Sequence, residues 1–456
     1  MRIRYLSFLL GFTLVTSGCG LLAPWIPQPS IPEACLPLSQ VFAGTPSPRR
    51  GGEGQEPGGY RGRSGRQEHA TDRVLVRFRP SAQLAEVQGL LGPFGGEVVR
   101  EIAPLRTRVI RVAPGRAEAA LAAFRRSGAV ESAEPDAPVF LQREPNDPLY
   151  RYQWHYRSVR LPQAWACTTG SSEVVVAVID DGITDHPDLR GIPVGGFDFV
   201  DGDGDPRWPG CWMSPETFSH GVHVTGVIAA LTNNGMGGAG VNWGPGGARI
   251  LPLRAFGSCP EDGGFVSDVV AAMVYAVDRG AQVINMSFAT PYFSELLAAA
   301  VRYAYQRGVV MVAAAGNTYS GPVEYPARFP EVIAVGAVNC RNERAVYSAE
   351  GPEVEVVAPG GSSVTECAMD GSPDGDLVLS ASTSLAQGHG YFRAQGTSLA
   401  APHVSGVVAL MMSRGIRGVE TIRQRLRATA LDLGEAGRDA RFGWGLLNAQ
   451  GAVGAR

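Results

Sequence analysis

The first regular pattern of hydrophobic and polar positions along the chain begins at about residue 72. Val74, Val76 and Phe78 alternate with polar neighbours, as in a half-buried strand. Further alternating or amphipathic runs predict strands over 97–102, 107–112 and 129–133 and helices over 81–91 and 117–126. The order strand, helix, strand, strand, helix, strand is the ferredoxin-like α+β arrangement. We therefore predict a small domain over residues 72–141.

Apolar runs without alternation characterise the rest of the chain, residues 142–456. Such runs suit parallel strands that are buried on both faces. Strands are expected at 174–179, 283–286, 309–313 and 332–335, and helices at 266–279, 294–307 and 404–414. This alternation of strands and helices predicts an α/β domain with a mainly parallel sheet.

The N-terminal residues 1–19 have the pattern of an export signal. Arg2 and Arg4 precede an apolar run that is too short to span a bilayer of ~30 Å, so we expect a signal peptide. The stretch Thr16–Cys19 resembles a bacterial lipobox, in which Cys19 would take lipid, although Thr16 departs from the usual Leu or Val. Two outcomes stay open: a lipoprotein at the cell surface or a freely secreted extracellular protein. Residues 20–71 are rich in Pro, Gly and Arg and predict a flexible linker.

Composition narrows the class of protein. The chain of 456 residues has 40 basic residues, all Arg, and 43 acidic ones, for a net charge of −3. With 18% charged and 45% hydrophobic residues, it is neither a disordered chain nor a polycation for nucleic acid, so we expect no nucleic-acid partner. We also expect a monomer.

Three short motifs carry the candidate chemistry. The run ending in Asp180-Asp181-Gly182 places an acid at the carboxyl end of a buried strand, where open α/β sheets bind ligands. His220 begins a Gly-interrupted apolar helix, and a second histidine, His223, lies three residues later without a third metal ligand. Ser398 lies in a tight Gly-Thr turn that enters a helix, whose free N–H groups favour negative charge.

Together, and in the order Asp, His, Ser, these motifs resemble the subtilisin-like serine peptidases (subtilases), with nearest likeness to thermitase-type members, over about residues 145–453. The resemblance implies a three-layer α/β/α sandwich preceded by the α+β domain. It also implies that Ser398 is the nucleophile, that His220 is its general base and that Asp180, rather than Asp181, orients the imidazole. Asn317, in Ala315-Gly316-Asn317, would donate to the oxyanion.

Substrates of subtilases bind as an added strand, which the resemblance places along residues 285–289. Many relatives have two glycines where this chain has Ala289 and Thr290, so the groove is expected to be narrower. Glu324 aligns with the floor of the pocket for the residue before the scissile bond, where a carboxylate would favour Arg or Lys; an exposed loop Glu is the alternative. The expected substrate-binding residues are Ser287, Phe288, Ala289, Ala314, Ala315, Gly316 and Glu324.

The resemblance gives the small domain a role as a prodomain that assists folding and then inhibits the enzyme from within the same chain. The segment Pro145–Pro148 usually lies just after the mature start, which puts self-cleavage near residues 141–143. Cleavage after Arg143 would agree with a basic preference at Glu324.

Structural calcium is the implied cofactor, since calcium binds six to eight oxygen ligands. A thermitase-type site would use Asp147, Asp188, the Asn234 side chain and the carbonyls of Leu231, Met236 and Gly238. A second candidate comprises Asp198, Asp203 and Asp205, in a loop that could equally be a solvated acidic turn.

The seven cysteines are an odd number, so at least one is expected outside internal disulfides. Some bacterial subtilases place a disulfide where this chain has Cys211 and Cys259, and Cys340 and Cys367 form a second expected pair. Cys35 and Cys167 remain, and we expect Cys167 to be a buried free thiol because maturation would separate the two.

Three hypotheses on function follow. The first is an exported serine endopeptidase that matures by cutting itself. The second is a binding or scaffold protein that has the fold but lost catalysis, which Val222, in place of the usual Thr, would favour. The third is a processing protease dedicated to one partner. Intact positions at Asp180, His220, Asn317 and Ser398 favour the first hypothesis.

Overall fold

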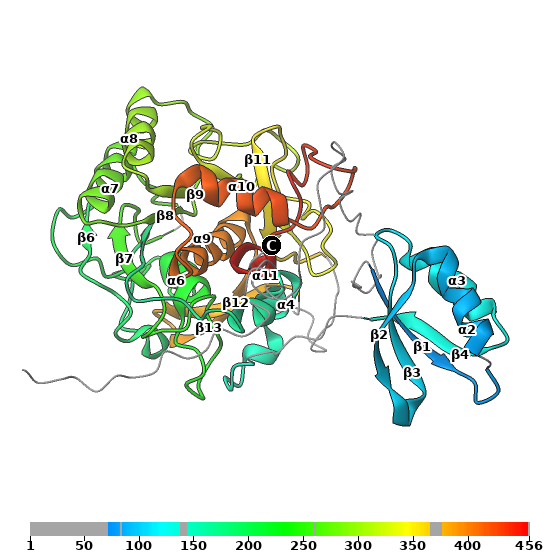
Figure 1. The fold of residues 1–456 in the computed structure, drawn as a ribbon. Helices are drawn as coiled ribbons and strands as arrows, with labels where there is room; N and C mark the ends of the chain where they lie inside the picture. The colour runs from blue at the N-terminus through cyan, green and yellow to red at the C-terminus, as the bar shows by residue number, and fades with distance from the viewer. Residues whose placement is uncertain (1–71, 83, 137–143, 260, 365–375, 455–456) are drawn as a thin grey trace, which may run out of the picture.

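The computed structural model describes residues 72–82, 84–136, 144–259, 261–364 and 376–454. They form a small domain, blue to cyan in Figure 1, and a larger one that contains the rest of the described chain. The N-terminal export segment, the linker, the expected self-cleavage site and Cys367 lie outside the described residues. No helix among the described residues is long and apolar enough to cross a membrane.

The small domain has the predicted order of elements. Its antiparallel sheet has the strand order β2-β3-β1-β4, and two helices accompany it. The elements are β1 (Arg73–Phe78), α2 (Leu84–Leu91), β2 (Glu97–Ile102), β3 (Thr107–Arg111), α3 (Ala117–Arg126) and β4 (Val130–Pro135). A single small cluster of buried side chains, which includes Val76, Ile110 and Phe124, forms its core.

The larger domain is built on a seven-stranded sheet in which every pair is parallel, in the order β11-β10-β9-β8-β5-β7-β6. The interior strands of this sheet consist mostly of buried apolar residues, which matches burial on both faces. The strands are β5 (Val175–Asp180), β6 (Phe197–Asp198), β7 (Arg249–Arg254), β8 (Val283–Met286), β9 (Val310–Ala314), β10 (Ile333–Val338) and β11 (Val354–Pro359).

Helices flank this sheet in two main pairs. In the first pair, α6 (His220–Ala229) packs against α9 (Thr397–Ser413), and both contact central strands; in the second, α7 (Val266–Asp278) packs against α8 (Glu295–Gln306) (Figure 1). An antiparallel hairpin packs against α6. The remaining elements are α4 (Trp154–Ser158), α5 (Leu161–Trp165), β12 (Val378–Ser384), β13 (Gly388–Ala394), α10 (Val419–Thr429) and α11 (Ala449–Val453).

The cysteines confirm one prediction and correct another. Cys211 and Cys259 form a disulfide, as expected. Cys167 is also disulfide-bonded, so the prediction of a free thiol there is wrong. Pairing depends on which sulfur atoms meet in space, and the position of a cleavage site in the chain does not determine that. Cys340 is disulfide-bonded too, and its expected partner lies outside the described residues.

Candidate active site

The fold brings three strand ends to one place. Asp180 is the last residue of β5, Ser287 follows β8 directly, and Ala315 to Asn317 follow β9. β5 pairs with β7 on one side and with β8 on the other. The order of the strands along the chain therefore changes direction across the sheet at β5. The carboxyl ends of parallel strands at such a switch in topology are where open α/β sheets place ligands.

His220 and Asp180 form the best-defined contact of the site. His220 is the first residue of α6, and its ring Nδ1 lies 2.8 and 3.0 Å from the two carboxylate oxygens of Asp180. The Asp180 side chain is buried, whereas the His220 side chain is 39% exposed. Burial lowers the pKa of His220, but the charge and hydrogen bond of Asp180, with the charge of Asp181, outweigh it and raise the pKa above 6.5.

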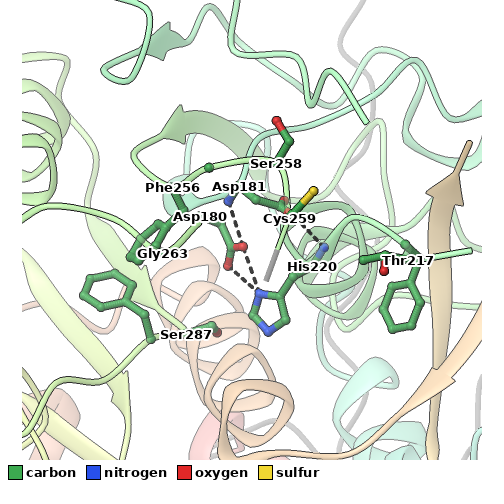
Figure 2. Close-up of a pocket in the computed structure, with 12 residues that line it drawn as sticks. Asp180, Asp181, Thr217, His220, Phe256, Ser258, Cys259, Gly263 and Ser287 are labelled. Carbon is green, nitrogen blue, oxygen red and sulfur yellow. Dashed lines mark hydrogen bonds and ion pairs between the residues drawn. The ribbon is translucent and has the colours of Figure 1, made fainter. Parts of the chain in front are cut away.

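Figure 2 shows the His220 ring with one edge against Asp180 and the other ring nitrogen turned away from it. The ring lies in a pocket of about 260 Å³ between two chain segments, one at Thr217 and Phe218 and one that contributes Phe256 to Cys259 together with Gly263. The Cys211–Cys259 disulfide borders this pocket, because Cys259 lines it. Ser287 lines it as well.

Ser398 enters the site as the second residue of α9, after Gly396 with φ +152°. A Cβ added to Gly396 would lie 2.9 Å from the Ser398 Oγ, so a side chain there would crowd the hydroxyl. The Ser287 Oγ donates to the Ser398 carbonyl at 2.7 Å and thereby joins α9 to the pocket that holds His220. Within the described chain no hydrogen bond joins His220 and Ser398, and such bonds are often long before substrate binds.

The amide of Asn317 has a fixed orientation. Its Oδ1 accepts hydrogen bonds from the Thr397 backbone N–H and from the Thr397 hydroxyl, both at 3.0 Å. The Asn317 Nδ2 is therefore free to donate a hydrogen bond. A Cβ added to Gly396 would lie 3.6 Å from this Nδ2 and 2.9 Å from the Ser398 Oγ, so both groups border the same space. An N–H donor consequently faces the space next to the hydroxyl.

The expected substrate strand leaves the sheet after Met286. Ser287 is buried, Phe288 is partly exposed and Ala289 is exposed. No backbone group of Phe288 or Ala289 is hydrogen-bonded among the described residues. Ala314 and Ala315 are buried at the end of β9. These free backbone groups could pair with an extended peptide.

Glu324 lies against the other expected pocket residues. Its backbone N–H donates to the Ala315 carbonyl at 3.0 Å, and its carboxylate would be 2.6 Å from a Cβ on Gly316. Within the described chain the carboxylate has no hydrogen bond or ion pair, and partial burial raises its pKa. It is thus a half-buried acid beside Asn317, rather than a fully solvated one.

The first candidate calcium site contains two buried carboxylates. The Asp147 oxygens accept from the backbone N–H groups of Asn233 and Asn234 at 2.6 and 3.1 Å, and the Asp188 Oδ1 accepts from the Asn234 amide at 2.8 Å. Burial raises the pKa of Asp188 to about 6, and the charge of Asp147 adds to this effect. Neither has a cationic partner among the described residues, so the uncompensated charge fits a cation.

The second candidate calcium loop already contains cationic partners. The Asp198 Oδ1 accepts from the backbone of Val200 and Asp201, and its Oδ2 binds the Arg254 guanidinium. Both oxygens of Asp205 bind Arg207, and one Asp203 oxygen accepts from the Asp205 N–H. These internal ion pairs leave few free oxygens, so this loop fits calcium less well than the first.

Three histidines are fully buried behind the site, one each on α4, α6 and α9. The His403 Nδ1 donates to the Leu399 carbonyl, so its Nε2 accepts from the His155 Nδ1 at 2.8 Å. The His223 Nε2 donates to the Phe392 carbonyl at 3.0 Å. Burial lowers the pKa of His223 and of His403 to about 4, and that of His155 also falls.

Comparison with known proteins places this arrangement in a family. Residues 171–445 match the model of the subtilase family, and residues 56–136 match the fervidolysin N-terminal prodomain. The chain therefore belongs to the subtilases and is a serine peptidase preceded by a prodomain. The prodomain match begins within the segment that we expected to be linker.

Individual relatives agree with this assignment. The chain is 36% identical over 382 residues to a thermophilic serine proteinase of Bacillus sp. (strain AK1), covering 83% of this chain and 86% of that protein. It is 34% identical over 311 residues to thermitase of Thermoactinomyces vulgaris, covering 68% of this chain and 99% of thermitase. Other relatives are named as extracellular proteases.

A solved structure agrees as well. A protease of Pseudoalteromonas arctica superposes on this chain with a TM-score of 0.60 at 34% identity. The match covers 68% of this chain and 99% of that structure.

Sequence reasoning missed two contacts of the site. Tyr391, on β13, donates to the Asp188 Oδ2 at 3.0 Å, and no motif marked it. The sequence presents Asp181 only as an alternative to Asp180, yet the Asp181 carboxylate contacts the start of α6. The doubled acid was the available signal, because a second carboxylate beside a catalytic one needs hydrogen-bond donors of its own.

Proposed function

We propose that the protein is an exported serine endopeptidase in which Asp180, His220 and Ser398 form the catalytic triad. The observation that carries the proposal is the contact of 2.8 Å between the Asp180 carboxylate and the His220 ring, which lies in the pocket. Ser287 also lines this pocket and is hydrogen-bonded to the carbonyl of Ser398 at the start of α9. His220 takes the proton of the Ser398 hydroxyl as this attacks the scissile carbonyl, and it then protonates the leaving amine. Asp180 holds the imidazole and stabilises the imidazolium.

The oxyanion of the tetrahedral intermediate is bound by the Asn317 Nδ2 and by the backbone N–H of Ser398. Preorganised donors of this kind stabilise charge that develops only in the transition state. The orientation of the Asn317 amide by Thr397 supports this role, because it presents the N–H rather than the carbonyl oxygen.

Self-maturation provides the test. The full chain and its Ser398→Ala variant are expressed in parallel, and the products are analysed by mass spectrometry. Only the unmodified chain should lose the prodomain, by a cut near residues 141–143. Equal trimming of both chains would show that another protease makes the cut, and an untrimmed, inactive unmodified chain would favour the scaffold hypothesis.

We further propose that Glu324 selects Arg or Lys before the scissile bond. Its carboxylate lies against Gly316, has no charged partner in the described chain and is partly desolvated, so a substrate cation would supply the missing counter-charge. Cleavage of a peptide library by the unmodified enzyme and by Glu324→Gln tests this. Loss of the basic preference in the variant supports it, and the absence of such a preference in the unmodified enzyme contradicts it.

Calcium at the Asp147–Asp188 site is proposed as a structural cofactor. When bound, the ion would neutralise the two carboxylates and hold the N-terminal segment of the mature domain on the loop after α6. Attachment to a membrane through a lipid on Cys19 stays a proposal, which mass spectrometry of the cell-associated protein would test.

A further inference from the structure

Asp180 and Asp181, two consecutive acids at the end of β5, contact different parts of His220, the proposed base. Asp180 contacts the ring, whereas the Asp181 Oδ2 accepts from the backbone N–H of His220 at 2.8 Å. The Asp181 Oδ1 accepts from the Gly221 N–H at 2.7 Å and from the Ser219 hydroxyl at 2.8 Å. All three donors belong to successive residues at the start of α6.

These bonds satisfy groups that a helix leaves unpaired. The first N–H groups of an α-helix have no partner within the helix. Here Ser219, the N-cap residue, accepts from the Val222 N–H, and Asp181 accepts from the two N–H groups before it. A carboxylate at this end also interacts favourably with the helix dipole.

The packing leaves Asp181 little freedom. Its side chain is buried, and a Cβ added to Gly221 would lie 2.8 Å from the Asp181 Oδ1 and 2.4 Å from the Gly182 carbonyl oxygen. Ser219 is held in turn by β12, through its N–H to the Thr383 carbonyl and its carbonyl to the Ser382 hydroxyl. The start of α6 is therefore clamped between the end of β5 and the hairpin.

We propose that Asp181 is a positioning residue for His220, which sets the start of α6 so that the imidazole meets Asp180 and which adds a second negative charge behind the imidazolium. The proposal rests on the triad role of His220 given above. It deepens that role, because it assigns a task to an acid outside the triad.

The ionisation state of Asp181 determines whether it can attract the imidazolium. Burial, and then the charge of Asp180, raise the pKa of Asp181, while the charge of His220 and the hydrogen bonds from Gly221 and Ser219 lower it. Asp180 from β5 and His220 from α6 are the titratable groups that face it, while β12 contributes hydroxyl and carbonyl groups to Ser219. A protonated Asp181 would present an O–H to donors and would lose its attraction for the imidazolium.

The test is the pH profile of kcat/KM for three enzymes, each expressed as the full chain and allowed to mature: the unmodified enzyme, Asp181→Asn and Asp185→Asn. Asp185→Asn is the control, because it changes an exposed acid on the same segment. Removing the charge should lower the pKa of His220, so the acid limb of Asp181→Asn should move down by about 1 pH unit, with kcat reduced roughly tenfold and KM unchanged. Asp185→Asn should match the unmodified enzyme.

Other outcomes overturn the proposal. Lower activity with an unmoved acid limb would leave Asp181 a purely structural residue, and a change confined to KM would make it a substrate contact. Should Asp181→Asn fail to fold, NMR titration of the His220 ring in the Ser398→Ala chain replaces it: a second inflection, besides that of the ring itself, supports the proposal, and a single inflection overturns it. Activity surviving in Ser398→Ala would instead refute the triad.

Discussion

Thr397 orients Asn317 through two hydrogen bonds to one oxygen, from the backbone N–H and from the hydroxyl, both at 3.0 Å. The Thr397 hydroxyl also accepts from the Gly316 N–H at 3.2 Å. Thr397, the residue before the proposed nucleophile, therefore fixes the orientation of the Asn317 amide, the proposed oxyanion donor. A substitution of Thr397 should consequently weaken oxyanion binding by Asn317.

Substitutions at these two positions should have graded effects. Asn317→Ala removes the donor and should lower kcat by about 10²–10³-fold, the magnitude known for this kind of donor in subtilisin. Thr397→Val removes one of the two orienting bonds and should lower kcat roughly fivefold, since one such bond is worth about 1 kcal/mol. KM should change little in both. Equal losses in the two variants would contradict the graded model.

Calcium should stabilise the folded enzyme through the first candidate site. A ligand present at about 100 times its Kd adds about 2.7 kcal/mol, or roughly 4 °C in Tm for a domain of about 300 residues. We expect a chelator to lower Tm by this amount in the Ser398→Ala chain, which cannot digest itself. Asp188→Asn should abolish the chelator effect, and Asp203→Asn should retain it. An unchanged Tm in the presence of chelator would argue against the site.

Acid should destabilise the protein through its buried histidines. The unfolded chain takes up these protons near pH 6.5, whereas folded His223 and His403 do so near pH 4. Between these values the unfolded chain binds more protons, so stability falls as pH falls from about 6.5 to 4. The loss is about 2 kcal/mol per histidine at pH 5, since one pH unit corresponds to roughly 1.36 kcal/mol.

His155→Gln gives the matched experiment. It removes one titrating group from the pair with His403, so the Tm difference between pH 7 and pH 5 should shrink. The control is His389→Gln, because His389 is exposed on the hairpin and its replacement should leave that difference unchanged. A difference that is equal in all three proteins would show that other groups cause the acid sensitivity.

The Cys211–Cys259 disulfide should support both stability and substrate binding. It closes a loop across 48 positions of sequence, and removing such a bridge typically costs about 2–4 kcal/mol. The double variant Cys211→Ala/Cys259→Ala should therefore have a lower Tm. It should also have a raised KM, because Cys259 and its neighbour Ser258 line the pocket beside His220. Unchanged values of both would contradict this role.

Most of the fold and the order of the candidate triad could be predicted, because strand ends and short motifs are local in sequence. The predicted strand 174–179 lies within one residue of β5, whereas α9 begins at Thr397, before the periodic pattern at 404. The bond state of Cys167 and the contacts of Asp181 could not be predicted. Both depend on which distant groups meet in space, and the residue types alone leave that open.

The small core of the N-terminal domain bears on how long this domain stays folded after it is cleaved from the enzyme. Domains of about 60–70 residues bury little surface and are marginally stable alone. Here one sheet edge, β2, has no buried residue, and one cluster around Phe124 holds the domain together. If this domain inhibits the enzyme, as the resemblance to subtilases implies, the enzyme stays inactive after the cut only while the cleaved domain remains folded. Warming would then act as the trigger, since unfolding would turn the inhibitor into a further substrate.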